Sequence, residues 1–211
     1  MEPTSTETAR IGLLGGTFNP VHIGHLIMAQ NAVEAFELDR IIFIPCHRPP
    51  HKASPSLAPA EDRLAMLEAA VEHDLQFEVS DIEIRRGGTS YTVDTLRWLV
   101  AEHPDTEFFF VVGSDSLREL HTWKHVAEIL ELCTIVAFER PARGRNAPVT
   151  PEDVQLPEPW PRRLIENMAP GRLIEVSSSE IRHRVAEGLS IRYLVPPETE
   201  IYIAEHHLYT S

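Results

Sequence analysis

Short apolar runs alternate with amphipathic segments over roughly the first two-thirds of the chain. The runs are rich in β-branched and aromatic residues, as buried strands are, and lie at residues 10–15, 40–45, 107–113 and 133–138. Apolar residues recur at helical spacing at residues 26–38, 61–74, 90–103 and 114–132, the last as one helix or two. Repeated strand-then-helix units predict an α/β fold with a doubly wound, mostly parallel sheet and helices on both faces.

Two further segments have the character of strands, and one helix has a candidate cap. Residues 76–86 alternate like a strand, and residues 171–176 are typical of a last strand. Ser90 or Thr92 is placed to cap the helix predicted over 90–103.

The rest of the chain separates into loops, a tail and a C-terminal helical extension. Proline-rich residues 46–59 and 139–161 predict long loops. A serine-capped helix over 177–188 and a second helix over 196–209 form the predicted extension. No internal repeat or linker divides the chain, so we expect a polar tail at 1–9 followed by a single domain at 10–211.

Composition limits the classes of partner. In 211 residues, 43% are hydrophobic, which is enough for a substantial core. The net charge of −13 disfavours a broad nucleic-acid or membrane-binding face, yet a few local donors can still hold a small phosphorylated substrate. The N-terminus has no apolar signal sequence, and the apolar runs are too short for a bilayer. With Cys46 and Cys133 interpreted as reduced thiols, although one disulfide remains open, we expect a cytoplasmic protein.

The stretch "GGTFNPVHIGHL", residues 15–26, stands between the first predicted strand and the first predicted helix. Its spacing matches neither GxGxxG nor GxxxxGK[ST]. The glycines let the backbone approach a ligand, Asn19-Pro20 turns the chain, and His22 and His25 fall one helical turn apart at an anion-favouring helix start. The alternative interpretation is a glycine turn beside two partly buried histidines.

Zinc is the main alternative for the histidines. His121 and His125 have a suitable spacing, as does the cluster of Cys46, His47 and His51. No HExxH pattern or complete set of four ligands exists, so we predict no protein-bound metal. In the same loop Lys52, held by prolines, is either a phosphate ligand or a solvated surface lysine.

Two more predicted helix starts carry polar residues. Asp115, after the strand at 107–113, is either a helix cap or a ribose ligand, and without further context the cap is favoured. Serines at 177–179 with Arg182 one turn later form a second candidate anion site. Two anion sites suit a reaction in which one phosphate attacks another and positioned donors stabilise the developing charge.

These motifs resemble those of a known family. "GGTFNPVHIGH" resembles the (H/T)xGH signature of the nucleotidyltransferase superfamily, and "VSSSEIR" resembles its second signature, ISSTxIR. With "FIPCHRPPHK", "EDRLAMLEAAV", "SYTVDTLRWL" and "GSDSLRELHTWKH", the set resembles the bacterial nicotinate-mononucleotide adenylyltransferase family from about residue 10 to residue 207. The resemblance implies a Rossmann-like fold and the reaction of ATP with nicotinate mononucleotide to give nicotinate adenine dinucleotide and pyrophosphate in NAD biosynthesis. Mg²⁺ would act on the phosphates.

The resemblance also implies roles for individual residues. The implied catalytic residues are His22, His25, Lys52 and Arg182. The implied ATP ligands are Gly15, Thr17, Phe18, His22, His25, Ser178 and Arg182. The implied ligands of the nicotinate nucleotide are Gly16, Lys52, Thr92, Asp115 and Trp123, with Trp123 stacking on the pyridine ring.

Several positions depart from the family pattern. Ser179 and Val176 replace Thr and Ile of the second signature, which are mild changes. Cys46 and His47 stand where relatives often carry Asn or Gln, and Lys124 stands where Tyr or His is common. These departures put the contacts of the 46–47 loop with the nicotinate nucleotide in question.

Alternative functions share parts of this pattern. The same transfer to nicotinamide mononucleotide or phosphopantetheine uses the same chemistry, and a non-catalytic nucleotide sensor uses the same fold. Class I aminoacyl-tRNA synthetases also carry HIGH, but this chain is short and acidic and lacks a KMSKS-like loop. The sequence leaves open whether the protein is a monomer or a homo-oligomer.

Overall fold

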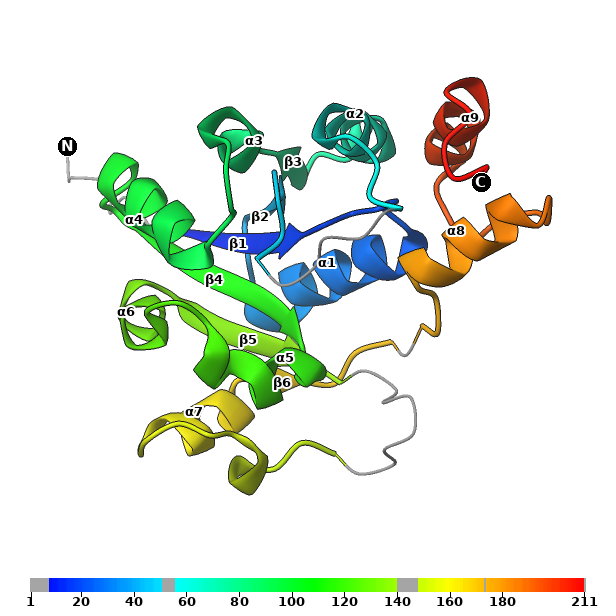
Figure 1. Cartoon of the computed structure of the whole chain (residues 1–211). Coiled ribbons are helices and arrows are strands. Elements are labelled where there is room, and N and C mark those ends of the chain that lie inside the picture. Colours follow the sequence, from blue (N-terminus) through cyan, green and yellow to red (C-terminus); the bar gives the residue numbers. More distant parts are fainter. Residues whose placement is uncertain (1–7, 51–55, 140–147, 173, 211) are drawn as a thin grey trace.

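The fold is built on one six-stranded sheet in the order β3-β2-β1-β4-β5-β6, with all strands parallel (Figure 1). The structure is a computed structural model that describes residues 8–50, 56–139, 148–172 and 174–210. The strands are β1 (Ala9–Gly16), β2 (Arg40–Pro45), β3 (Phe77–Val79), β4 (Thr106–Gly113), β5 (Thr134–Phe138) and β6 (Met168–Ala169). This order is that of a doubly wound sheet, so the predicted fold class is confirmed.

The helices connect these strands and extend beyond the last one. They are α1 (Ile23–Phe36), α2 (Ala60–Val71), α3 (Ile82–Arg86), α4 (Thr92–Glu102), α5 (Ser114–Glu119), α6 (Val126–Leu132), α7 (Trp160–Glu166), α8 (Ser178–Ala186) and α9 (Pro197–Glu205). Two 3₁₀ turns, η1 (Leu120–Thr122) and η2 (Pro151–Asp153), lie between them. The predicted helix over 114–132 is thus two helices, and α8 and α9 form the predicted C-terminal extension (Figure 1).

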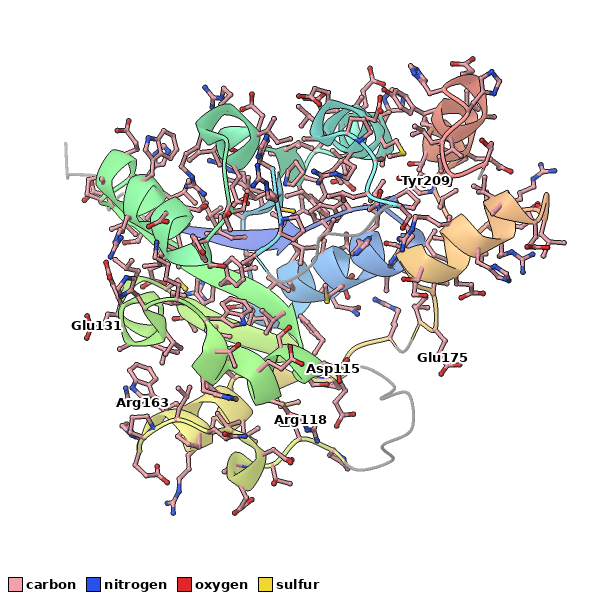
Figure 2. All side chains as sticks on the ribbon, viewed as in Figure 1. Asp115, Arg118, Glu131, Arg163, Glu175 and Tyr209 are labelled. Carbon is pink, nitrogen blue, oxygen red and sulfur yellow. The ribbon has the colours of Figure 1, made fainter. Side chains whose placement is uncertain are left out.

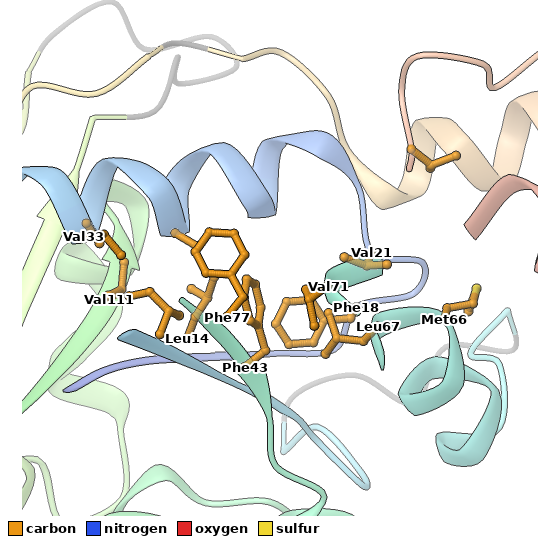
Figure 3. Packing of buried hydrophobic residues seen from close by; sticks show 14 of the residues in the cluster. Leu14, Phe18, Val21, Val33, Phe43, Met66, Leu67, Val71, Phe77 and Val111 are labelled. Carbon is orange, nitrogen blue, oxygen red and sulfur yellow. The ribbon is translucent and has the colours of Figure 1, made fainter. Parts of the chain in front are cut away.

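The alternation of side chains along the strands produces two cores, one on each face of the sheet. In β4, Phe109 and Val111 pack in the first core with residues of α1, α2, α8 and α9. Phe108 and Phe110 point the other way and pack with residues of α4, α5, α6 and α7. Figure 3 shows the first core. The prediction of helices on both faces is therefore confirmed.

The strand order reverses direction between β1 and β4. The chain proceeds from β1 outward to β2 and β3, then returns to β4 on the other side of β1. Ligands of doubly wound sheets bind in the crevice at the carboxyl ends of the strands at such a switch point. β1 ends there at Gly16 and β4 ends at Gly113, which places both predicted ligand-binding segments at one edge.

The prediction of one strand over residues 76–86 is wrong. Only Phe77–Val79 pairs with β2, and Ile82–Arg86 forms the short helix α3. In α3 the adjacent residues Ile82 and Glu83 are both buried, and the Glu83 carboxylate accepts a hydrogen bond of 2.6 Å from the Thr95 hydroxyl of α4. Contact with α4 therefore overrides the local alternation.

The last strand is also not where it was predicted. It is the two-residue β6, and the described residues of 171–176 belong to no strand. Arg172 instead donates a hydrogen bond of 2.6 Å to Asn31 Oδ1 and pairs with Glu34 at 3.7 Å. These contacts hold the segment along α1 rather than in the sheet.

The predicted caps have mixed outcomes. Ser177 caps α8, where its hydroxyl accepts from the Glu180 N–H at 3.2 Å, as predicted. Neither Ser90 nor Thr92 caps α4, because Tyr91 holds the cap position and makes no side-chain cap bond. The Ser90 hydroxyl instead accepts from the His47 N–H at 3.0 Å, which joins two loops beside the site.

Within the described residues, no helix is long and apolar enough to cross a membrane. Both cysteines carry free thiols, so the disulfide alternative is wrong in this structure. Burial raises the pKa of the Cys46 thiol, although the neighbouring Arg63 charge opposes that effect.

Candidate active site

Both glycines at the end of β1 lie in the strand itself, which extends to Gly16, one residue beyond the predicted run. A Cβ on Gly15 would lie 3.2 Å from Phe110 Cζ, and one on Gly16 would lie 3.0 Å from Phe18 Cζ. A side chain at either position would therefore press against an aromatic ring, which would have to shift by a few tenths of an ångström. With glycine at both positions, no side chain separates the backbone of β1 from the crevice at the switch point.

The histidine pair lies directly after the turn that follows β1. The sequence predicted both histidines on one face of the helix. His22 instead occupies the cap position before α1, with extended backbone. The two rings nevertheless stack, with centroids 3.7 Å apart and planes at 21°. The Phe18 ring packs edge-on against His25 with centroids 4.9 Å apart and so supports the stack.

A backbone contact determines the proton position on His25. The His22 N–H donates to His25 Nδ1 at 3.2 Å. Because a backbone N–H can only donate, Nδ1 is unprotonated, and the neutral ring carries its proton on Nε2. His25 can therefore offer an N–H to an anion bound in front of α1.

The residues of α8 hold the turn after β1. Ser178 Oγ donates to the Pro20 carbonyl at 2.9 Å, and Arg182 Nη1 donates to the Asn19 carbonyl at 2.8 Å. Arg182 also donates to Ser179 Oγ at 3.3 Å. The two predicted anion sites, far apart in the sequence, are therefore joined by direct hydrogen bonds.

Two cavities adjoin at this edge of the sheet. The first, of about 310 Å³, is lined by the ends of β1 and β4 together with His25, Cys46, Thr92 and Trp123. The second, of about 370 Å³, is lined by Thr17, Phe18, Asn19, His22, His25, Pro49, Leu57 and residues 176–179 and 182. His25 lines both, so an anion placed near this ring would stand at the boundary between two ligand subsites.

Most predicted site residues fall into these cavities. The second cavity contains the predicted ATP ligands Thr17, Phe18, His22, His25, Ser178 and Arg182. The first contains Gly15, Gly16, Thr92 and Trp123, and the Trp123 ring packs edge-on against Phe110 at 5.8 Å. Gly15, expected on the ATP side, thus lies with the predicted ligands of the nicotinate nucleotide.

One predicted residue is not brought into the cavities. Asp115 is exposed on α5 and lines neither cavity (Figure 2). It is also not the cap of α5, because Gly113 holds that position. Lys52 lies outside the described residues, as does His51.

The positions that depart from the family pattern have clear local partners. His47 Nδ1 lies 2.9 Å from the Gly88 carbonyl oxygen, which ties its loop to the segment before α4. The Lys124 ammonium lies 3.2 Å from Asp94 Oδ2 and 4.3 Å from the Tyr91 ring centroid. Asp94 therefore already balances the charge of Lys124, the residue that follows the cavity-lining Trp123.

The buried Arg63 was missed by the sequence analysis. Its side chain is fully buried and donates to the carbonyl oxygens of Thr17 at 2.8 Å, His47 at 3.0 Å and Ala58 at 3.1 Å. It therefore joins the turn after β1, the loop after β2 and the start of α2. The available signal was an arginine four residues before Leu67, on the buried stripe of the predicted helix.

Asn19 was assigned only a turn, yet it is a buried hydrogen-bonding centre. Its Oδ1 accepts from the Ala58 N–H at 3.0 Å and from the Tyr209 hydroxyl at 2.8 Å, and its Nδ2 donates to the Ser56 carbonyl at 2.9 Å. Tyr209 gave no sequence signal, because the partner that it contacts lies 190 positions away.

The histidines and acidic residues do not gather into a metal site in the described part of the chain. No group of three or more His, Cys, Asp or Glu side chains is placed to hold an ion there. His121 and His125, the candidate zinc pair, are both exposed around η1 and α6. The positively charged and N–H-bearing groups at the switch point favour an anionic ligand instead.

A doubly wound sheet with two candidate anion sites at its switch point is typical of a nucleotide-binding α/β protein. Residues 13–184 match the family described as cytidylyltransferase-like. Two solved structures of nicotinic acid mononucleotide adenylyltransferase from Plasmodium falciparum, complexed with NaAD and with APC, share the fold. They have TM-scores of 0.72 and 0.71 and are 19% and 18% identical, each match covering 95% of this chain and 97% of the other.

Bacterial relatives are more similar in sequence. A protein of Opitutus terrae is 44% identical over 95% of this chain and 97% of its own. One of Synechococcus sp. (strain JA-3-3Ab) is 43% identical over 99% of both chains. Both are named "Probable nicotinate-nucleotide adenylyltransferase". The chain therefore belongs to the cytidylyltransferase-like family and, within it, to the bacterial nicotinate-nucleotide adenylyltransferases.

Proposed function

We propose that this protein transfers the AMP moiety of ATP to nicotinate mononucleotide, giving nicotinate adenine dinucleotide and pyrophosphate in NAD biosynthesis. One observation carries the proposal: two cavities meet at His25 on the switch-point edge of the sheet. A transfer between two nucleotides needs two subsites whose phosphates meet at one point. The names of the bacterial relatives support the same reaction.

The chemistry is a single displacement at the α-phosphorus of ATP. A phosphate oxygen of nicotinate mononucleotide forms a bond to that phosphorus, while the bond from the phosphorus to the oxygen that bridges to the β-phosphate breaks. Pyrophosphate leaves with the bonding electrons. His22 and His25 stand at the helix start where charge builds, and we assign them to stabilise the transferred group and leaving oxygen by hydrogen bonding.

The two cavities divide the ligands. ATP occupies the cavity beside α8, where Thr17, Phe18, Ser178 and Arg182 hold its phosphates. Nicotinate mononucleotide occupies the cavity between β1 and β4, where Gly15, Gly16, Thr92 and Trp123 surround its ring and ribose. Lys52 stays a predicted phosphate ligand, and Asp115 would reach a nucleotide only if the ligand extended out to the surface of α5.

We propose that Mg²⁺ enters with the nucleotide rather than in a protein cage. Nucleotidyltransferases of this kind generally use a divalent metal with ATP. The absence of a carboxylate or histidine cluster among the described residues suits an ion held by phosphate oxygens and water. When bound, the ion neutralises phosphate charge. The single domain at 10–211 and the cytoplasmic location stay predictions.

The testing experiment is pyrophosphate release from Mg-ATP with four parallel additions. These are nicotinate mononucleotide, nicotinamide mononucleotide, phosphopantetheine and no acceptor. We expect release with the first addition, at a kcat/KM at least tenfold above that with any other. Release that favours another acceptor would keep the chemistry and overturn the substrate. No release from folded protein would favour the nucleotide-sensor alternative.

A further inference from the structure

The end of the chain reaches back to the turn that follows β1. Figure 2 labels Tyr209 near the end of the chain. Its hydroxyl donates a hydrogen bond of 2.8 Å to Asn19 Oδ1. The α9 helix ends at Glu205, and the backbone then enters the left-handed region twice, with φ of 52° at His207 and 62° at Tyr209. Residues other than glycine adopt this region at a cost, so the contacts of the C-terminal segment must hold it there.

The hydroxyl of Tyr209 is a dependable donor. Burial raises the pKa of Tyr209, and this effect exceeds the opposing influence of the Arg182 and Arg63 charges. The phenol therefore keeps its proton throughout the neutral range. Its partner Asn19 is 4% exposed, so little water competes for the bond.

Asn19 also contacts one of the predicted ATP ligands, Arg182. The Asn19 carbonyl accepts from Arg182 Nη1 at 2.8 Å, and the Asn19 residue itself lines the cavity assigned to ATP. The Asn19 Oδ1 that accepts from Tyr209 also accepts from the Ala58 N–H at 3.0 Å. Asn19 thus links the C-terminal segment, which is bonded to its side chain, with Arg182, which is bonded to its main-chain carbonyl.

We propose that Tyr209 is a positioning residue for ATP: by fixing the Asn19 side chain, it sets the turn after β1 and the Arg182 guanidinium in their binding arrangement. The test of this inference by KM values rests on the proposed function, because it measures adenylyl transfer. Tyr209 lines neither of the two site cavities, so it acts through Asn19. The effect falls on ATP rather than on the acceptor, because Asn19 lines only the cavity assigned to ATP.

The chain offers a matched control on the neighbouring helix. The Tyr202 hydroxyl of α9 donates a hydrogen bond of 2.9 Å to Asp62 Oδ1 of α2. It is also a tyrosine bond between the C-terminal segment and the body of the protein. Neither Tyr202 nor Asp62 lines either site cavity.

The experiment compares Tyr209→Phe with Tyr202→Phe, each of which removes one oxygen and leaves the ring. For Tyr209→Phe we expect the KM for Mg-ATP to rise about three- to tenfold, the size of one lost buried hydrogen bond. The KM for nicotinate mononucleotide should change less than about twofold, and Tyr202→Phe should leave both constants within that range. Equal effects of the two variants, or an unchanged KM for Mg-ATP in Tyr209→Phe, would overturn the proposal.

A double-mutant cycle distinguishes positioning from simple anchoring of the C-terminus. In an Asn19→Ala background, Tyr209→Phe should no longer change the dissociation constant of a non-hydrolysable ATP analogue, because the link is already broken. A loss of affinity equal to that in the wild-type background would contradict the role of Asn19. Calorimetry with the analogue needs no turnover, so it tests Tyr209 even if the acceptor assay refutes the proposed function. Should Asn19→Ala fail to fold, the comparison of the analogue's affinity between Tyr209→Phe and Tyr202→Phe gives the decision.

Discussion

At the scale of single residues, the histidine pair shows how backbone geometry prepares a side chain for chemistry. The His22 N–H occupies Nδ1 of His25, which leaves the proton of the neutral ring on Nε2. Stacking at 3.7 Å and the buried Phe18 ring limit the freedom of both imidazoles. Groups held in this way stabilise developing charge without reorganising at the moment of reaction.

Replacing His22 by alanine should lower kcat by about 10²- to 10³-fold, since one positioned donor to the transferred group is lost. Circular dichroism should still show the folded protein. His183→Ala is the control, because His183 is exposed on the same α8 helix that carries Arg182. Steady-state pyrophosphate release measures both variants. Turnover within about threefold of the wild type in His22→Ala would remove this residue from the transition state.

At the scale of elements, the site depends on how three loops are held together at the end of the sheet. Arg63 of α2 supplies three donors to carbonyls from three different segments. If Arg63 were removed, the carbonyl oxygens of Thr17 and His47 would lose a hydrogen-bond donor in a partly buried place. The arginine thus links the packing of α2 to the shape of both cavities.

We expect Arg63→Met to lower the free energy of unfolding by about 3 kcal/mol, because methionine fills the space but donates to none of the three carbonyls. Arg85→Met is the control. The Arg85 side chain is 67% exposed, and its ion pair in the described part of the chain is with Asp81, the residue before α3, so its loss should cost less than about 1 kcal/mol. Urea unfolding compares them, and similar midpoints for the two variants would contradict the role given to Arg63.

At the scale of the whole molecule, an acidic protein has to bind an acidic nucleotide. The net charge is −13, yet the switch-point edge gathers a helix start, two histidines and Arg182. Local donors at short distance outweigh distant like charges, which salt screens. The phosphate groups should therefore contribute much of the binding free energy of ATP.

A non-hydrolysable ATP analogue at about 100 times its dissociation constant should stabilise the protein by about 2.7 kcal/mol. For a chain of this length that corresponds to a rise in Tm of about 5–10 °C. Adenosine at the same concentration should give a much smaller rise, since it lacks the phosphates. Differential scanning fluorimetry measures both. An equal rise with adenosine would show that the phosphate contacts assigned to His22, Ser178 and Arg182 contribute little.

Local patterns in the sequence were sufficient for most of the strands and helices and for the segments that line the candidate site. Buried parallel strands need continuous apolar runs, and helices need a repeat near 3.6 residues, so both are visible within short windows. The glycine and histidine stretch and the Ser178–Arg182 helix start were visible for the same reason: helix starts and turns constrain nearby residues. The pattern failed over 76–86, where contact with α4 decided between strand and helix.

Long-range contacts were decided only by the tertiary structure. The sequence predicts two anion sites, but only the folded chain joins these segments through Arg182 and Asn19, which are 163 positions apart. Arg63 and Tyr209 look like ordinary polar residues until burial gives them partners from distant segments. A hydrogen bond between distant residues leaves no periodic trace in either segment, because it depends on how the whole sheet and its helices pack. The sequence alone therefore determined the class of protein and predicted its ligand-binding residues, and the packing determined how those residues are held.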